Sequence, residues 1–218
     1  MLAILQAEQG LMANDLSADD ARVACPLFQA EYGGAIPTSA LQLRIVKISS
    51  LLAKTLNEMW HSRMPQIGSY NICAPCFAAE CNNLYYAIAM WSLPIAANRI
   101  RNGDRCLELR RMAIAPDAPR NTASRMLAVM TRVVKKERPD IIRLLSYQDT
   151  EVHAGTIYKA AGWRAVSTSK FISWSVHSKR PGRLDQSFAP KVRWELALRD
   201  DDGKRDAKVK PIKHEELF

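Results

Sequence analysis

Three side chains that can move protons or bind a metal follow the predicted strand Ile141 to Tyr147. Asp149 lies just past the C-terminal end of that strand, where α/β sheets usually place their ligands. His153 lies in the turn that follows, and Tyr158 lies on the next short helix. Asp149 can act as a base, bind a metal or cap a turn. Tyr158 can donate a proton or pack against the sheet, and a lone histidine in a turn is more often structural.

A second group of residues, PDAPRNTASRML, directly precedes the amphipathic helix predicted from Arg120 to about Glu137. The unpaired N–H groups at a helix start favour an anion. The small side chains of Thr122, Ala123 and Ser124 allow a pyrophosphate to approach the backbone, while Arg120 adds positive charge and Ser124 a hydroxyl donor. The same pattern also fits an ordinary capped surface helix.

The elements that must position these groups follow a β-α-β-β-β-α-β-α-β-β order. At 218 residues and 48% apolar composition, the chain fits one α/β domain with appendages. A helix capped by Ser49 or Ser50 stops by Pro65, and Asn82-Asn83 suits a hairpin turn. The predicted strands are 41–49, 69–79, 84–96, 106–115, 141–147, 171–178 and 191–198, and a third helix covers 156–161.

Two of these motifs resemble the GNAT-type acyltransferases. Arg120-Asn-Thr-Ala123-Ser124-Arg125 is similar to the family's Arg/Gln-x-x-Gly-x-Gly/Ala turn, although Ala123 replaces a glycine and Arg125 a small residue. Tyr158-Lys-Ala-Ala-Gly162-Trp163 is similar to the family's Tyr-x-x-x-Gly-Phe. The resemblance implies an α/β (α+β) fold with a GNAT-like mixed sheet of about six to seven strands flanked by helices. It also implies acetyl-CoA as cofactor, with Tyr158 protonating the departing thiolate.

The longer segment Leu43 to Val166 resembles the phage Mom-type proteins, a divergent GNAT branch, best over Leu109–Leu127 and Ser146–Trp163. This resemblance implies an enzyme that uses acetyl-CoA to convert adenine in DNA to N6-(carbamoylmethyl)adenine, protecting phage or mobile-element DNA from restriction. It assigns catalysis to Tyr158, Asp149 and His61, which are also the ligands if iron is bound. For the cofactor it picks out Arg111 and Ser124, and together with the turn the predicted cofactor-binding residues are Arg111, Met112, Ile114, Arg120, Asn121, Ala123 and Ser124.

Two other functions remain open on the sequence. One is a GNAT-type N-acetyltransferase that acts on a small amine or a protein, and the other is a non-catalytic DNA-binding module with a vestigial cofactor pocket. An adenine amino nitrogen is a poor nucleophile, so the Mom-like reaction needs a nearby base or metal. Asp149 and His61 are the candidates for that role.

The distribution of charge predicts the domain boundaries and the partner. The net charge is +9, but residues 1–40 carry one basic against five acidic side chains. We expect an acidic N-terminal extension over 1–38, the GNAT-like domain over 39–198 and a charged, disordered tail over 199–218. Segment 164–193 has seven basic residues against Asp185 and contains Phe171, Trp174 and His177, which can stack on unpaired bases. Double-stranded DNA is the predicted partner of this segment, and a solvated basic face is the alternative.

The remaining signals limit the class of protein. Five cysteines, an odd number, argue against a disulfide framework. Cys73, Cys76 and Cys81 lack a second Cys-x-x-Cys or paired histidines, so ordinary buried thiols are expected rather than zinc. No run has the length of a membrane span and the N-terminus lacks a signal-peptide layout, which predicts a protein of the bacterial host's cytoplasm without a membrane partner.

Overall fold

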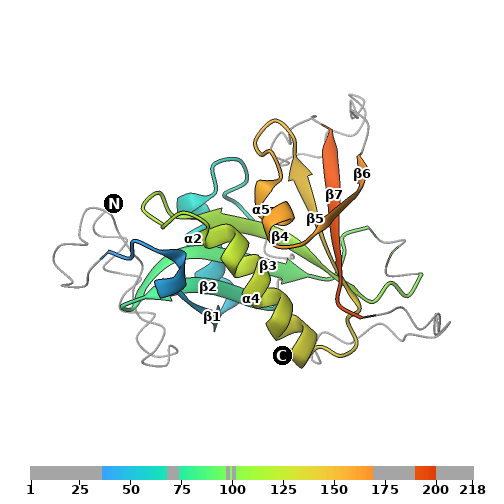
Figure 1. Ribbon diagram of the computed structural model, residues 1–218, viewed down its shortest axis with the longest axis horizontal. Helices are drawn as coiled ribbons and strands as arrows, with labels where there is room; N and C mark the ends of the chain where they lie inside the picture. Colours follow the sequence, from blue (N-terminus) through green and yellow to red (C-terminus); the bar gives the residue numbers. More distant parts are fainter. Residues whose placement is uncertain (1–35, 68–73, 97–98, 100–101, 169–189, 200–218) are drawn as a thin grey trace.

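The computed structural model describes residues 36–67, 74–96, 99, 102–168 and 190–199. Within these ranges seven strands form one mixed sheet in the order β1-β2-β3-β4-β5-β7-β6 (Figure 1). Every neighbouring pair is antiparallel except β4 and β5. The strands are β1 Arg44–Ile48, β2 Cys76–Cys81, β3 Leu84–Ser92, β4 Cys106–Ile114, β5 Arg143–Asp149, β6 Arg164–Thr168 and β7 Lys191–Ala197. The predicted sheet of six to seven strands is therefore confirmed.

Three helices connect the strands at the predicted places. They are α2 Ser50–Trp60, α4 Thr122–Glu137 and α5 Thr156–Ala160. The Ser49 side chain accepts a hydrogen bond from the Leu52 N–H and thereby caps α2. Asn82 and Asn83 both have positive φ, as the two central residues of a type I′ hairpin turn require.

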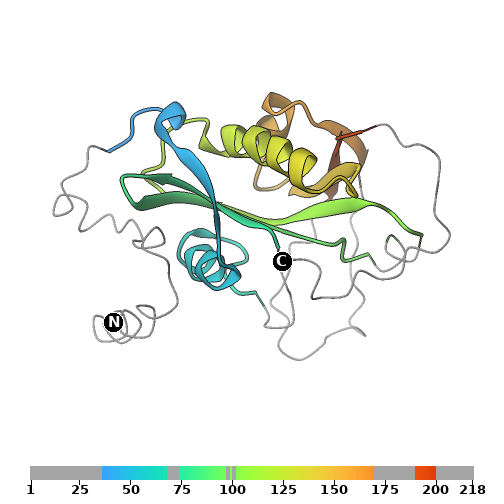
Figure 2. The ribbon, with the colours of Figure 1, turned by 90° about the horizontal axis from the view of Figure 1, so that it is seen from below.

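The two faces of the sheet are covered by different helices (Figure 2). On one face Met126 and Met130 of α4 pack against Trp91 of β3 and Leu107 of β4. On the other face Leu56 of α2 lies in a smaller apolar cluster. Because β2 and β3 carry apolar side chains toward both clusters, nearly all of their residues are buried.

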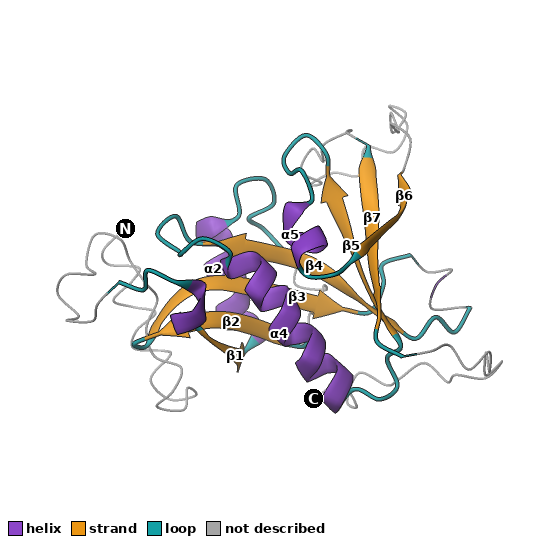
Figure 3. Ribbon diagram, in the orientation of Figure 1, coloured by secondary structure: helices purple, strands orange, loops and turns teal. Residues whose placement is uncertain are grey.

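The sheet splits between β4 and β5, and we call this divergence the fork. The two strands pair only from Cys106↔Arg143 to Leu109↔Ser146. Beyond Leu109, β4 continues beside β3 alone, and beyond Ser146, β5 continues beside β7 alone. Figure 3 shows the two strands separating, with α5 above the gap. Beyond Leu109 and Ser146, β4 and β5 therefore no longer pair with each other.

One strand of the sheet was not predicted. It is β6, directly after Trp163, while the predicted strand 171–178 lies outside the described residues and stays a prediction. All five residues of β6 are exposed, because β6 is an edge strand that pairs with β7 alone. Such a strand lacks the apolar alternation on which the prediction relied.

Several expectations fall wholly or partly outside the described residues: the acidic extension, the tail, Cys25, Cys73 and most of the basic segment. The domain boundaries therefore stay predictions. Cys76 and Cys106 are buried free thiols, and Cys81 is a half-buried one. Over the ranges that the structure describes, no helix combines the length and the apolar character needed to cross a membrane.

Candidate active site

A pocket of about 410 Å³ lies between the N-terminus of α4 and the short helix α5. Ile114, Arg120, Asn121, Ala123 and Ser124 line one side, and Thr156 and Ile157 of α5 line the other. The structure thus brings five of the seven predicted cofactor residues to one cavity. Arg111 and Met112, the other two, do not line it.

The turn before α4 is built so that the helix start faces this pocket. Asn121 takes a left-handed conformation with φ of 68°, which asparagine tolerates better than most residues. The Thr122 hydroxyl donates to the Pro119 carbonyl at 2.6 Å, and the Ser124 hydroxyl donates to the Asn121 carbonyl at 3.0 Å. The pocket therefore meets a helix N-terminus with its positive dipole end, an arrangement suited to an anion.

Arg125, the residue that departs from the small-residue pattern of the turn, does not line the pocket. Its guanidinium reaches away and donates to the Leu43 carbonyl at 3.4 Å, next to β1. The departure therefore links α4 to the first strand and leaves the space in front of the helix start open. Ala123 adds only a methyl group to that space.

A β-bulge explains why Arg111 lies elsewhere. Met90 pairs with Arg111 and Trp91 with Leu109, so Arg110 is an extra residue on β4. Before the bulge Leu109 packs on the α4 side, whereas after it Ala113 packs on the α2 side. Arg111, two residues before Ala113, shares the α2 side, where its charge acts on His61. Met112 packs against the core on the α4 side.

Tyr158 is packed inside the core, with its hydroxyl at the fork. Its ring stacks on Trp194 with 5.3 Å between centroids and lies 5.7 Å from the ring of Trp163. Its hydroxyl is 2.9 Å from the hydroxyl of Ser146, the last β5 residue paired with β4. Burial raises the pKa of Tyr158, and the hydrogen bond with Ser146 opposes that rise. The phenol is consequently protonated at neutral pH, as a proton donor must be.

The loop between β5 and α5 is tied down by its own side chains. Asp149 Oδ1 accepts the Glu151 N–H at 3.1 Å, and its carbonyl accepts the His153 N–H. Gln148 accepts from the Trp194 indole N–H at 2.6 Å and donates to the His153 carbonyl. Asp149 therefore caps the turn through Oδ1, while within the described part of the chain Oδ2 accepts no hydrogen bond.

Gly155 closes this loop at the start of α5. Its φ is +73°, and a Cβ built there would lie 2.6 Å from both Gln148 Oε1 and Trp194 Cζ2. Only glycine therefore fits between the loop and β7. The position of Tyr158, three residues later, depends on this close approach.

His61 ends α2 on the opposite side of the sheet from α4. Its Nδ1 accepts the N–H groups of Arg63 at 3.3 Å and Met64 at 3.1 Å. Burial lowers the pKa of His61, and the charges of Arg111 and His153 lower it further. The neutral ring whose Nδ1 accepts these bonds carries its proton on Nε2. This arrangement favours a hydrogen-bond donor role for Nε2 over the role of base.

The positions of His61, Asp149 and Tyr158 do not support the expected iron site. Among the residues that the structure describes, no three His, Cys, Asp or Glu side chains gather where they could hold a metal ion. The Tyr158 hydroxyl points to Ser146 inside the core, and His61 Nδ1 is occupied by backbone N–H groups. His61, Asp149 and Tyr158 therefore do not form a fitting donor set, and we route no step through a metal.

Four residues of the site were missed from the sequence: Ser146, Gln148, Gly155 and Trp194. Gly155 carried the clearest signal, since an isolated glycine just before a short helix often marks positive φ or a close backbone approach. Trp194 and Gln148 meet across β5 and β7, which are far apart in the sequence, so no local pattern indicates their contact. Of the basic segment, the structure describes Arg164, Lys191 and Arg193.

Comparison with known proteins shows which family the region of this site is similar to. Residues 88–187 match the family described as the Mom protein family, a range that contains the fork, the pocket and Tyr158. No curated protein matches the chain.

Solved structures with similar folds are acetyltransferases of low sequence identity. The ribosomal-protein-S18-alanine N-acetyltransferase from Escherichia coli is 15% identical at a TM-score of 0.50, over 74% of this chain and 97% of that one. A Bacillus subtilis acetyltransferase in complex with CoA is 12% identical at 0.50, over 71% and 98%. An acetyltransferase of the GNAT family from Desulfovibrio desulfuricans is 14% identical at 0.50, over 72% and 99%. Residues 88–187 thus match the Mom protein family, and the chain has the GNAT acetyltransferase fold.

Proposed function

We propose that this protein is a transferase that takes a two-carbon unit from acetyl-CoA and modifies adenine in DNA, with N6-(carbamoylmethyl)adenine as the product. The observation that carries the proposal is the Mom-family match over residues 88–187, because it spans the fork together with the anion-binding turn and Tyr158. The similar fold of a CoA complex supports acetyl-CoA as the donor.

In this proposal the α4 turn holds the pyrophosphate of acetyl-CoA. The helix start and Arg120 supply the positive charge, while Ser124, whose hydroxyl donates to the Asn121 carbonyl, lines the pocket. The acyl end of the cofactor then extends from Ile114 back along β4 toward the fork. The unpaired edge of β4 offers backbone hydrogen-bonding groups along that path.

Tyr158 acts when coenzyme A leaves. As a nitrogen nucleophile adds to the thioester carbonyl carbon and forms the carbamoyl C–N bond, the C–S bond breaks. The sulfur keeps the bonding electron pair and takes the phenolic proton of Tyr158, so that neutral thiol departs. Ser146 holds the phenol at the fork by the 2.9 Å hydrogen bond. A positioned general acid of this kind typically accelerates a reaction about 10²- to 10⁴-fold.

The adenine approaches from the face that α2 covers. The poorly nucleophilic N6 amino group bonds to the methyl carbon of the two-carbon unit and loses a proton, which Asp149 at the open end of β5 accepts. The methyl group loses a second proton and two electrons in this step, and a two-electron oxidant takes up these electrons. The His61 Nε2–H, whose orientation the Arg63 and Met64 N–H groups fix, donates to a ring nitrogen of the base. The product protects phage or mobile-element DNA from restriction in the cytoplasm of the bacterial host.

Mass analysis of nucleosides tests the acceptor. DNA from cells that express this protein is digested, and N6-(carbamoylmethyl)deoxyadenosine is expected in the digest. The matched control is Tyr158→Phe, which removes one hydroxyl. Unchanged deoxyadenosine with wild-type protein that is expressed and folded would overturn the DNA-modifying function and favour an N-acetyltransferase that acts on a small amine or a protein.

Thermal unfolding tests the donor. Acetyl-CoA binds the native state alone, so saturating acetyl-CoA should raise the unfolding midpoint. An unchanged midpoint at millimolar acetyl-CoA would contradict cofactor binding and favour the non-catalytic DNA-binding module.

A further inference from the structure

Tyr147 is an exposed aromatic residue next to the fork. It follows Ser146, the last β5 residue paired with β4, and 42% of its surface is accessible. Side chains alternate along a strand, and Ser146 reaches Tyr158 on the α5 side. The ring of Tyr147 therefore lies on the opposite face, the one from which the proposed acceptor approaches. Core packing would account for a buried ring, whereas this ring is exposed to solvent next to the fork.

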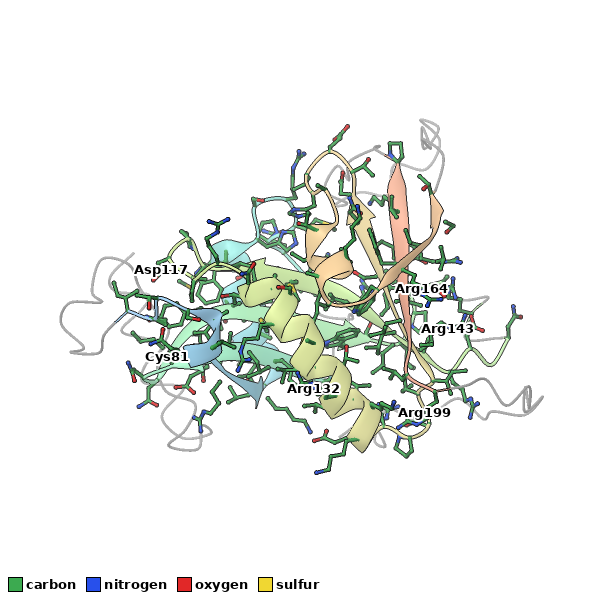
Figure 4. The ribbon with its side chains drawn as sticks, in the orientation of Figure 1. Cys81, Asp117, Arg132, Arg143, Arg164 and Arg199 are labelled. Atoms are coloured by element: carbon green, nitrogen blue, oxygen red, sulfur yellow. The ribbon has the colours of Figure 1, made fainter. Side chains whose placement is uncertain are left out.

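A group of arginines held by Glu195 lies on the same face of the sheet as this ring. Arg193 of β7 is the direct cross-strand partner of Tyr147. The side chains of directly paired residues lie on the same face of the sheet. Glu195 fixes three guanidinium groups on this face, since its carboxylate lies 2.9 Å from Arg193, 3.4 Å from Arg143 and 3.8 Å from Arg99. Arg143, labelled in Figure 4, lies at the start of β5.

The β4 bulge brings more positive charge to the same face. Arg110 lies 3.8 Å from Glu108, and Arg111 acts on His61, so both bulge residues lie opposite α4. In the described part of this face, the basic side chains outnumber the acidic ones even with Asp104, which lies 3.0 Å from Arg99 and 4.0 Å from Arg143, and Lys191 pairs with Asp149 across the strands. The acidic groups order the arginines without cancelling their charge.

We propose that Tyr147 is the stacking platform for the unpaired acceptor base, with the arginines of this face holding the flanking phosphates. An exposed aromatic ring beside guanidinium groups is the arrangement on which unpaired bases stack. The amino group of a paired adenine is engaged inside the duplex, so enzymes that act on a base extrude it from the stack. Stacking at Tyr147 keeps the extruded base within one residue of the fork. This inference rests on the proposed function, since it presumes a nucleic-acid acceptor.

The charge on this face argues for a nucleic acid over an apolar partner. A hydrophobic protein segment would have to desolvate ordered arginines, whereas phosphates meet them directly. Tyr147 and Arg193 are directly paired on neighbouring strands, which lets one nucleotide contact both.

A fluorescent base measures this stacking directly. The probe is a short single-stranded oligonucleotide with 2-aminopurine in place of one adenine, titrated with full-length protein at low salt. Wild type and Tyr147→Phe should quench the fluorescence and bind alike, because both present a ring. Tyr147→Ala should bind about 5- to 150-fold more weakly, the range expected for one lost base–aromatic stack. Leu51→Ala, which truncates an exposed apolar residue at the far end of α2, should bind as wild type does.

Two outcomes of this titration overturn the inference: equal binding by Tyr147→Ala and wild type, or no quenching by wild type. Tyr147 is exposed, so the alanine variant should unfold at the wild-type midpoint. The proposed function is tested separately by modified nucleosides in cells. Wild-type levels of modified adenine from cells with Tyr147→Ala would contradict the platform while leaving the DNA-modifying function in place.

Discussion

At the scale of single residues, the site depends on how Tyr158 is held. The phenol lies between Trp163 and Trp194, and its hydroxyl bonds to Ser146. The packed tyrosine and the proton donor, which the sequence left as alternatives, are compatible in this structure. The ring is buried, yet its hydroxyl ends at the point where β4 and β5 part.

Removing the Tyr158 hydroxyl should separate chemistry from binding. For Tyr158→Phe we expect kcat to fall about 100-fold or more, because the departing thiolate loses its proton donor. The affinity for acetyl-CoA should stay near the wild-type value because the ring packing is kept, whereas loss of the buried hydrogen bond with Ser146 should lower the free energy of unfolding by about 1–3 kcal/mol. Steady-state kinetics and thermal unfolding check this, and an unchanged kcat would contradict the role of Tyr158.

Gly155 offers a test of how the loop holds α5. Gly155→Ala should lower the free energy of unfolding by more than about 3 kcal/mol, because positive φ and a clash with Gln148 and Trp194 act together. Gly162→Ala is the matched control, since Gly162 also has positive φ but open space around it. The control should cost only about 1–2 kcal/mol. Equal losses in urea unfolding would contradict the close packing at Gly155.

At the scale of elements, the start of α4 and the end of α2 make the two sides of the site. The α4 turn follows β4 and presents its helix N-terminus to the pocket. The end of α2 is closed by His61 and by Asn57, whose Nδ2 donates to the carbonyls of Met64 and Pro65 at 3.0 and 2.7 Å. Side chains thus fix both segments.

Adding a negative charge to the α4 turn should weaken the binding of acetyl-CoA. Ser124→Glu removes a hydroxyl and places a carboxylate where the pyrophosphate is proposed to bind. We expect the Kd for acetyl-CoA to rise about tenfold or more. Arg132→Gln changes the net charge by the same amount on the exposed side of α4 (Figure 4) and should leave the Kd unchanged. Calorimetric titration of both variants measures this, and equal effects would indicate a nonspecific charge effect.

The loop after α2 should respond to acid through His61. The folded-state pKa of His61 is lowered, so the native state binds its proton less readily than the unfolded chain. The contribution of His61 to the free energy of unfolding is therefore fully present above the ordinary pKa of 6.5. It is lost as the pH falls through that value toward the folded-state pKa. Urea unfolding at pH values above and below 6.5 should show a loss that His61→Gln reduces. A pH dependence as steep in that variant would contradict the assignment.

At the scale of the whole molecule, much of the fold could be predicted from local patterns. The Ser49 cap, the Asn82-Asn83 turn and the apolar face of α4 each carry a short-range signal, and each lies where it was expected. The edge strand β6 was missed because neither of its faces is buried.

The predicted site was recovered less evenly, for a physical reason. The turn residues Arg120 to Ser124 meet in one pocket because they are neighbours in the sequence. The side of the sheet on which Arg111 lies depends on the β-bulge at Arg110, and the sequence Arg110-Arg111 gives no local signal for a bulge. The hydrogen bond between Ser146 and Tyr158 arises only when α5 folds back onto β5. Long-range pairings such as these are absent from any local pattern.

The central claim is that the carbon atoms added to adenine come from acetyl-CoA. Cells that express the protein can be fed acetate labelled with carbon-13 at both positions, and their DNA digested to nucleosides for mass spectrometry. We predict N6-(carbamoylmethyl)deoxyadenosine with both labelled carbons in wild-type cells and a strongly reduced signal with Tyr158→Phe or Ser124→Glu. Modified deoxyadenosine without the label, or deoxyadenosine that is unmodified although the protein is folded, would contradict the account.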